Sequence, residues 1–257
     1  MDNSNLLNYR VIGNGYPVVF LHGFLESIEM WNYFSFENDF QCILIDLPGH
    51  GDSAHFSKAS TSMNLMAKEV QKVIQKLNLN EYSVVGHSMG GYVCLELKKM
   101  DQRCQKLVLL NSNFWKDSEL KKEDRRRVSD IVKKNKNLFL YEAIPNLFND
   151  PAYYDKDIKA IIATAKNMDA STIGLVSLAM AKRIGFENDL LSFSDELLIV
   201  QGEFDTIVSK EKMNEALLDL PEIDVRWIKS GHMAHIEETE KTQVIILDFL
   251  NEKTETY

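Results

Sequence analysis

The 257-residue sequence has few cysteines, no long hydrophobic run and no excess of basic residues. Its three cysteines, Cys42, Cys94 and Cys104, are an odd number and lie inside apolar segments, so we expect reduced core residues in a cytoplasmic protein. The longest apolar runs, such as Leu107–Leu110 and Val244–Leu247, are far too short to span a bilayer. The first ten residues contain no basic segment followed by an apolar one, so no signal peptide is predicted.

The charge balance and the missing ligand motifs exclude further classes of protein. The formal net charge is −9, and an acidic chain lacks the basic surface that nucleic acids and anionic membranes require, so we predict neither partner. Neither a C-x-x-C nor an H-E-x-x-H pattern occurs, so we predict no metal site and no cofactor. The length suits one sizeable domain with its own core, and the oligomeric state is left open.

Short β-rich runs alternate with helical patterns along most of the chain. This alternation predicts an α/β fold, with a mostly parallel sheet covered by helices on both faces. Asn14-Gly15 between the first two runs predicts a tight hairpin and therefore an antiparallel edge. The predicted strands are Asn8–Gly13, Pro17–Gly23, Gln41–Leu47, Tyr82–His87, Lys106–Ser112, Glu196–Gly202 and Val225–Ser230.

The interval from residue 113 to residue 194 interrupts this rhythm. It contains helical patterns and no convincing strand of a parallel sheet, so we predict a helical insertion over one end of the sheet. The predicted core then comprises residues 1–112 and 195–257. The insertion begins with a highly charged stretch, Lys116–Lys136, which we interpret as the solvated face of a helix.

The stretch Val84–Gly91, VVGHSMGG, contains the pattern G-x-S-x-G between a predicted strand and a predicted helix. That is the context of a nucleophile elbow, in which a sharp turn lifts the serine hydroxyl out of the sheet. Small residues two positions before and after the serine let the strand and the helix approach each other. We therefore identify Ser88 as a candidate nucleophile. The alternative is a glycine turn with an incidental serine.

A serine hydroxyl needs a base, and the base needs an acid that orients it. His232, directly after the last predicted strand, is the candidate base. Asp205 follows another strand, at the edge of the sheet where ligands and catalytic groups gather, and we prefer it to Glu203 as the candidate acid. Capping of the next helix is a compatible role for Asp205. A metal site built from His232 and His235 lacks a third ligand nearby.

An oxyanion formed during acyl transfer also needs hydrogen-bond donors. One candidate is the backbone N–H of Met89, directly after the candidate nucleophile. The other is the backbone N–H of Phe24, in the His22-Gly23-Phe24 turn after a predicted strand. Taken alone, that turn is equally well explained as the end of the strand.

Five segments in order, FLHGFLESIEMW, DLPGHGDSA, VVGHSMGG, GEFDTIV and SGHMAHIEE, resemble the α/β-hydrolase superfamily. The resemblance implies a mostly parallel sheet of eight strands, with the helical insertion as the variable cap. It implies a catalytic set of Ser88, Asp205 and His232, in the chain order of that superfamily. Some relatives carry the acid after the strand that ends near Asn111, but no carboxylate stands there in this sequence.

A serine nucleophile favours hydrolysis of a carboxylic ester, a lactone or a related small acyl substrate through an acyl-enzyme. Enol-lactonases of aromatic catabolism are similar. The first half of the chain also resembles the menaquinone-pathway lyase that expels pyruvate, although Tyr92 stands where that family usually has arginine. A receptor-like binding module with slow or no turnover is a further alternative.

Substrate selection is expected to lie in the cap. Its apolar residues are candidates for an acyl pocket, although most of them are expected in the cap's own core. The predicted substrate-binding residues are Phe24, Trp115, Phe148, Leu178 and Met180.

Overall fold

The computed structural model describes residues 6–54 and 61–252, which are built around one seven-stranded sheet. The strand order is β1-β3-β2-β4-β5-β6-β7, and every neighbouring pair is parallel except β1 and β3. Each predicted strand overlaps one strand of the sheet. These are β1 (Tyr9–Ile12), β2 (Pro17–Leu21), β3 (Gln41–Ile45), β4 (Tyr82–His87), β5 (Cys104–Leu110), β6 (Leu197–Gly202) and β7 (Asp224–Ile228).

Two details of the predicted sheet are wrong. The described residues form seven strands rather than eight, because each predicted run supplies one strand and no further run pairs with the sheet. The predicted hairpin at Asn14-Gly15 does not form, because β1 pairs with β3 and places Tyr9 opposite Ile45. Both edges of β2 are occupied by β3 and β4, so β1 takes the free edge of β3. The predicted antiparallel edge is confirmed.

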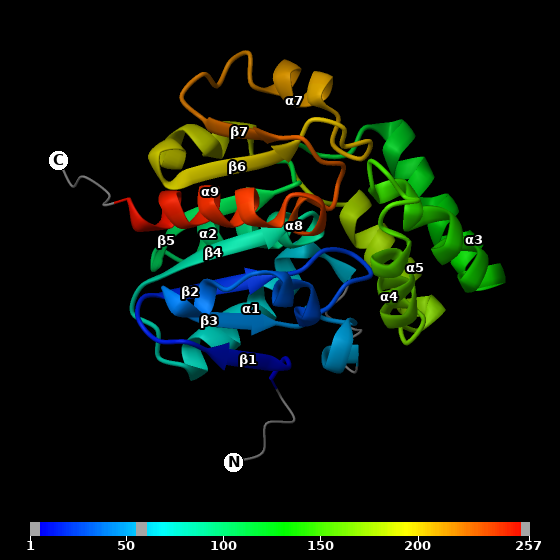
Figure 1. The fold of residues 1–257 in the computed structure, drawn as a ribbon, viewed down its shortest axis with the longest axis horizontal. Helices are drawn as coiled ribbons and strands as arrows, with labels where there is room; N and C mark the ends of the chain where they lie inside the picture. Colours follow the sequence, from blue (N-terminus) through cyan, green and yellow to red (C-terminus); the bar gives the residue numbers. More distant parts are fainter. Residues whose placement is uncertain (1–5, 55–60, 253–257) are drawn as a thin grey trace.

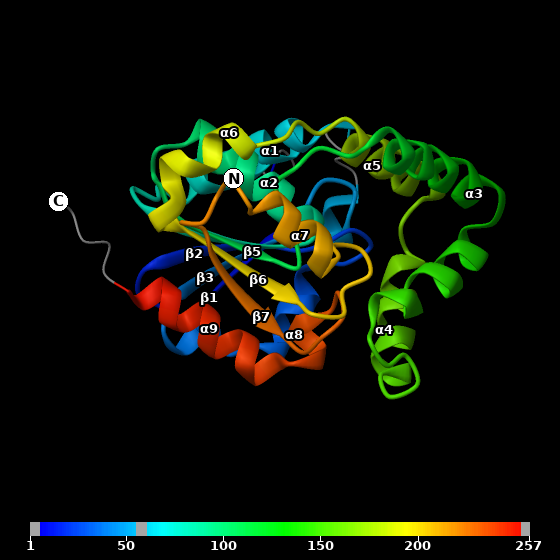
Figure 2. The same cartoon turned by 90° about the horizontal axis from the view of Figure 1, so that it is seen from above.

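Helices cover both faces of the sheet (Figures 1 and 2). On one face lie α1 (Met63–Lys76), α2 (Met89–Met100) and α7 (Lys210–Ala216). On the other lie η1 (Ile28–Tyr33), η2 (Phe36–Asn38), α8 (Ala234–Glu237) and α9 (Thr239–Asn251).

The alternation of side chains along each strand creates these two cores. In β2, Val19 and Leu21 face α1 and α2, whereas Val18 and Phe20 face η1 and α9. A buried parallel sheet needs apolar side chains on both faces, which explains why the strands read as continuous apolar runs.

The segment between β5 and β6 is helical and lies beyond one end of the sheet (Figure 1). Apolar side chains of α3, η4, α4 and α5 pack in a cluster of their own, with Leu25 and Met233 from the rest of the chain. By contrast, Leu190 belongs to the core under α1 and α2, so α6 lies against the sheet (Figure 2). The elements are α3 (Glu119–Ala143), η4 (Pro145–Leu147), α4 (Asp155–Ala165), α5 (Ala170–Ala181), α6 (Glu187–Leu190) and η5 (Leu191–Glu196).

In the described part of the chain, α1, α3 and α7 begin at a serine cap. The hydroxyls of Ser62, Ser118 and Ser209 accept a hydrogen bond from the backbone N–H three residues later, at the starts of α1, α3 and α7. Each cap satisfies one of the N–H groups that a helix start leaves without an internal partner. All three cysteines are buried and unpaired. Among the described residues, every helix is too short or too polar to cross a membrane.

Candidate active site

Ser88 stands on a strained turn between β4 and α2. Its φ of 48° and ψ of −114° lie outside the usual regions for a residue with a side chain. The glycines make the turn possible. A Cβ at Gly86 would lie 2.5 Å from the carbonyl carbon of Gly90, and a Cβ at Gly90 would overlap the carbonyl oxygen of Leu21. The backbone crowding therefore requires glycine at both positions of the G-x-S-x-G pattern.

The structure brings Ser88, His232 and Asp205 together from three distant segments. The Ser88 Oγ lies 2.8 Å from Nε2 of His232, and Nδ1 of that ring lies 2.8 Å from Oδ2 of Asp205. His232 and Asp205 are buried, whereas Ser88 is partly exposed. A ring that donates Nδ1–H to a carboxylate presents a lone pair at Nε2. It can therefore accept the serine proton as the oxygen attacks an electrophile.

Asp205 is fixed by hydrogen bonds to both carboxylate oxygens. Oδ1 accepts from the backbone N–H groups of Ile207 and Val208, at 2.8 and 3.0 Å. Oδ2 accepts from the side-chain amides of Asn111 and Gln201, at 3.1 and 2.8 Å. Burial by itself would raise the pKa of Asp205, but His232 and these donors outweigh it and hold the pKa below its ordinary value. The carboxylate is therefore ionised at neutral pH.

The two rival residues from the sequence have other partners. The Glu203 carboxylate lies 3.2 Å from Nζ of Lys210 and does not contact His232. His235 is completely buried, and its Nε2 lies 3.8 Å from Oε1 of Glu26. The structure therefore offers no pair of His232 and His235 converging on a metal.

The two backbone amides expected to bind an oxyanion lie at the ends of two neighbouring parallel strands, β2 and β4. Met89 is the first residue of α2, where a backbone N–H has no acceptor within the helix. Phe24 is on the loop after β2 and lines the cavity that Ser88 also lines. Positive helix-end potential and free N–H groups favour negative charge at this place.

A family model describing the alpha/beta hydrolase fold matches residues 16–150, more than half of the chain. The chain belongs to the alpha/beta hydrolase fold family. That family's fold accounts for the mostly parallel sheet and for the serine on the turn after a central strand.

Individual relatives are similar over nearly the whole chain. The chain is 26% identical to the dihydrolipoyllysine-residue acetyltransferase component of an acetoin cleaving system from Pseudomonas putida, over 96% of this chain and 67% of that protein. It is 26% identical to a putative 2-succinyl-6-hydroxy-2,4-cyclohexadiene-1-carboxylate synthase from Bacillus subtilis (strain 168), over 91% and 89%. A malate-bound structure of a thermophilic esterase from Thermogutta terrifontis has a TM-score of 0.84 at 25% identity, over 95% of this chain and 92% of that chain.

Beside this set, Glu26 and His87 connect three loops of the hydrolase fold. Oε2 of Glu26 accepts hydrogen bonds from the Gly23 N–H, at 2.6 Å, and from Nδ1 of His87, at 2.8 Å. Nε2 of His87 donates to the carbonyl oxygen of His232, at 2.9 Å. Because both ring nitrogens donate, His87 carries a proton on each and forms an ion pair with Glu26. The pair links the Phe24 loop, the serine turn and the backbone of His232.

The pKa shifts of this pair agree with that assignment. Burial would raise the pKa of Glu26, but the neighbouring His87, with smaller contributions from His235 and His22, lowers it to about 2. Burial would lower the pKa of His87, but Glu26 reverses the effect and the pKa is raised. The sequence alone does not indicate this role of His87, since its partner lies 61 residues away along the chain.

Glu26, His87 and His235 are the one group in residues 6–54 and 61–252 with ligand atoms close enough to hold a metal, all within 4.8 Å of one another. A carboxylate and two imidazoles are ligands that suit Zn²⁺. Both nitrogens of His87 already donate hydrogen bonds, so a cation would have to displace the proton between His87 and Glu26. The hydrogen-bonded ion pair accounts for the closeness of Glu26 and His87 without a metal.

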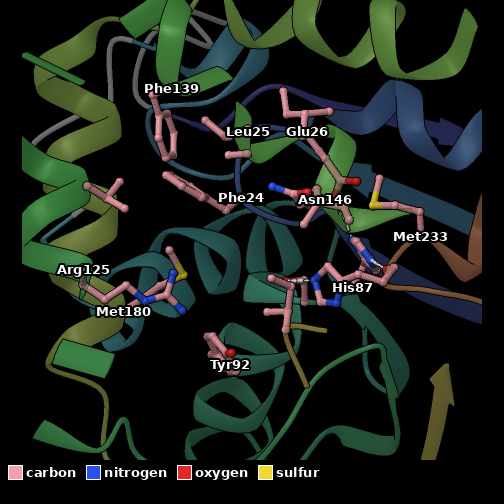
Figure 3. A pocket seen from close by; sticks show the side chains of 17 residues that line it. Phe24, Leu25, Glu26, His87, Tyr92, Arg125, Phe139, Asn146, Met180 and Met233 are labelled. Carbon is pink, nitrogen blue, oxygen red and sulfur yellow. Dashed lines mark hydrogen bonds and ion pairs between the residues drawn. The ribbon is translucent and has the colours of Figure 1, made fainter. Parts of the chain in front are cut away.

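A cavity of about 290 Å³ separates the serine turn from α3, η4 and α5. Figure 3 shows Phe24, Phe139 and Met180 around it, with Arg125 extending into it from α3. Ser88 and His232 line its floor, and most other lining side chains are apolar. The cavity therefore suits an acyl group of modest size next to the serine oxygen.

The predicted substrate-binding residues divide into two groups. Phe24 and Met180 line this cavity. The other three do not line it: Trp115 packs edge-on against Phe114 and lines a neighbouring cavity, Phe148 stacks on Tyr154 among the helices after β5, and Leu178 is partly buried on α5. Phe148 therefore helps to hold the helices between β5 and β6 together, whereas Trp115 packs in the core under α1 and α2.

Arg125 is a charged lining residue that the sequence did not indicate. It belongs to the charged stretch interpreted as a solvated helix face, and its neighbours Arg126 and Arg127 are indeed exposed. Arg125 lies one helical turn from Lys121 and Ser129, on the face of α3 that turns inward. The helical spacing within the charged run was the one sequence signal that could have indicated the inward position of Arg125.

Proposed function

We propose that the protein is a serine hydrolase that cleaves a carboxylic ester, a lactone or a related acyl substrate. In this proposal Ser88 is the nucleophile, His232 the base and Asp205 the acid that orients the base. The observation that carries it is the pair of 2.8 Å contacts from Ser88 Oγ to His232 and from His232 to Asp205.

The first half of the reaction forms an acyl-enzyme. Ser88 Oγ attacks the carbonyl carbon while Nε2 of His232 takes the hydroxyl proton. The resulting imidazolium is stabilised by the ionised Asp205 carboxylate. His232 then returns the proton to the leaving oxygen, the carbon–oxygen bond breaks, and the alcohol departs.

The second half uses the same residues with water. His232 removes a proton from water, the hydroxide attacks the acyl carbon, and the carboxylic acid leaves as Ser88 regains its proton. In both halves the backbone N–H groups of Phe24 and Met89 are the proposed donors to the oxyanion. The ion pair of Glu26 with His87 supports this geometry, because it connects the Phe24 loop to the backbone of His232.

The lyase that expels pyruvate is the second candidate. The similarity to the putative 2-succinyl-6-hydroxy-2,4-cyclohexadiene-1-carboxylate synthase from Bacillus subtilis favours this candidate. Tyr92 argues against the lyase, because it follows Gly91 at the position where that family usually has arginine. The Tyr92 hydroxyl accepts a hydrogen bond from Asn113, and the Arg183 guanidinium stacks on its ring. A binding module without turnover is the candidate from another class. It would keep the cavity and hydrolyse no ester.

Steady-state hydrolysis of short p-nitrophenyl esters and of lactones tests the proposal. We expect Ser88→Ala to lower kcat by about 10³-fold or more, because the covalent route is lost. The control is Ser171→Ala, which changes an exposed serine on α5 and should retain full activity. Equal activity of Ser88→Ala and the wild type would overturn the assignment, and release of pyruvate from a lyase substrate without ester cleavage would favour the second candidate.

A further inference from the structure

A second cavity, of about 170 Å³, lies next to the one above Ser88. Tyr92, Arg125 and Ile207 line both cavities, so these side chains form the boundary between them. Most residues that line the first cavity are apolar, whereas most residues that line the second are polar or charged. A substrate that enters the first cavity with a polar end therefore has a place for that end beyond Tyr92.

The second cavity is rich in positive charge, although the protein as a whole has a net charge of −9. Basic side chains outnumber acidic ones by two in its lining. The basic residues are Lys121, Arg125, Arg183 and Lys212, and the acidic residues are Asp117 and Asp124. Such a local excess of positive charge in an acidic protein attracts anions.

The guanidinium of Arg183 has several partners within the protein. Its Nη1 lies 2.7 Å from Oδ1 of Asp117, and both side chains are at most 5% exposed. It also donates to the carbonyl oxygens of Trp115 and Met180, and its guanidinium lies 4.1 Å from the centre of the Tyr92 ring. The Asp117 carboxylate is therefore neutralised by Arg183.

Arg125 has no comparable partner. In the described part of the chain, the only hydrogen bond of its side chain runs from Nε to Oδ2 of Asp117, with a length of 3.4 Å. The side chain is 15% exposed, and Figure 3 shows it directed into the cavity beside Met180. Its two terminal nitrogens are thus available in a space that is largely closed to solvent.

An arginine in this setting suits a carboxylate. The planar guanidinium presents parallel N–H donors that match the two oxygens of a carboxylate. A cation held away from water with one weak partner is costly, and a bound anion removes that cost. Burial and the charge of Arg125 lower the pKa of the neighbouring Lys121, which agrees with uncompensated positive charge here.

We propose that Arg125 binds a carboxylate at the far end of the substrate, so that the substrates are esters carrying a second, free carboxylate group. This inference rests on the proposed function, since it places the scissile ester at Ser88. Tyr92 and Met180 flank the path between the serine and the arginine. The protein thus distinguishes anionic from neutral esters.

Two matched pairs of esters test the proposal, with hydrolysis followed by acid release in a pH-stat. Monomethyl adipate against methyl hexanoate places the carboxylate on the acyl side, and 4-acetoxybutanoate against pentyl acetate places it on the alcohol side. We expect the wild type to prefer the charged member of at least one pair. In Arg125→Gln the ratio of kcat/KM, charged over neutral, should fall by about 10- to 100-fold, the value of a charge-assisted hydrogen-bonded pair.

The control is Arg127→Gln, which removes an exposed arginine of the same helix, 61% accessible, and should leave the ratio unchanged. Arg125→Lys keeps the positive charge but lacks the parallel N–H donors of the guanidinium. It should therefore recover part of the preference for the charged ester. Rates on the neutral esters show whether each variant is folded and active. An unchanged ratio in Arg125→Gln for both pairs would overturn the proposal.

A binding measurement separates this proposal from the hydrolase proposal. Adipate should raise the Tm of the wild type but not of Arg125→Gln, and adipamide should raise neither. If no ester is hydrolysed while adipate still stabilises through Arg125, the hydrolase proposal fails and the carboxylate site stands. If neutral esters are hydrolysed and adipate gives no Arg125-dependent shift, the carboxylate site fails and the hydrolase proposal stands.

Discussion

Two buried histidines, His50 and His235, contribute to the dependence of this protein's stability on pH. Burial, with a smaller effect of His22, lowers the pKa of His50 to about 3. Burial and the charge of His87 lower the pKa of His235 to about 3 as well. The unfolded chain protonates each ring near pH 6.5, while the folded protein keeps both rings neutral. Each ring therefore contributes stability above pH 6.5 that is lost as the pH falls towards 3.

We predict that His50→Asn makes the stability less sensitive to acid. As the pH falls from 6 to 4, each such histidine lowers the free energy of unfolding by about 1.4 kcal/mol per pH unit. The slope of the free energy of unfolding against pH should therefore be smaller by that amount in the variant. His87 has a raised pKa and acts in the opposite sense, but it is present in both proteins. Urea unfolding at several pH values measures the slope. The same slope in both proteins below pH 6 would contradict the prediction, and equal slopes from pH 7.5 to 8.5 serve as the control.

At the residue scale, the sequence located Ser88, Asp205 and His232 but not the side chains that hold them. The three carry recognisable local patterns, each at the end of a strand. Asn111 and Gln201, which donate to Asp205, and Glu26, which binds His87, have no pattern of their own. Their roles depend on which strand ends are neighbours, and only the sheet order provides that information.

At the scale of elements, the turn from β4 to α2 depends on the lack of a side chain at position 90. We predict that Gly90→Ala destabilises the protein by more than about 3 kcal/mol, because the new methyl group overlaps the backbone of Leu21. Alanine is the better helix former by about 1 kcal/mol, which is too little to compensate.

Gly185→Ala is the matched control. A Cβ there would meet only the carboxylate end of Glu187, an exposed and flexible side chain that can move away. Thermal unfolding and ester hydrolysis should therefore be close to wild type in Gly185→Ala. Equal stability of the two variants would show that the backbone crowding at Gly90 is unimportant.

Local sequence patterns predict some features of these elements and fail to predict others. The apolar runs identified every strand, because a buried strand needs apolar residues on both faces. The partner of β1 could not be derived in this way, since Asn14-Gly15 favours a hairpin and the free edge of β3 decides the pairing. The interpretation of the charged run in α3 failed for another reason. Its composition indicates a solvent-exposed helix face, while its helical spacing turns Arg125 inward.

At the scale of the whole molecule, the sheet fixes the positions of the reactive groups and the helices of residues 113–194 close the space above them. The division into a core and a cap at these residues stays a prediction, as does the cytoplasmic location. The cavity between the serine turn and α3, η4 and α5 explains how one end of the sheet would hold a substrate away from water. The polar cavity beyond Tyr92 extends the same space.

Covalent labelling of the serine tests the proposed hydrolase chemistry most directly. The wild type is treated with a fluorophosphonate and examined by intact-protein and peptide mass spectrometry. We predict one adduct per chain, located on Ser88, absent in Ser88→Ala and formed much more slowly in His232→Ala. No adduct on Ser88, or labelling of Ser88 at the same rate without the His232 ring, would contradict the proposal that these two side chains form the catalytic centre.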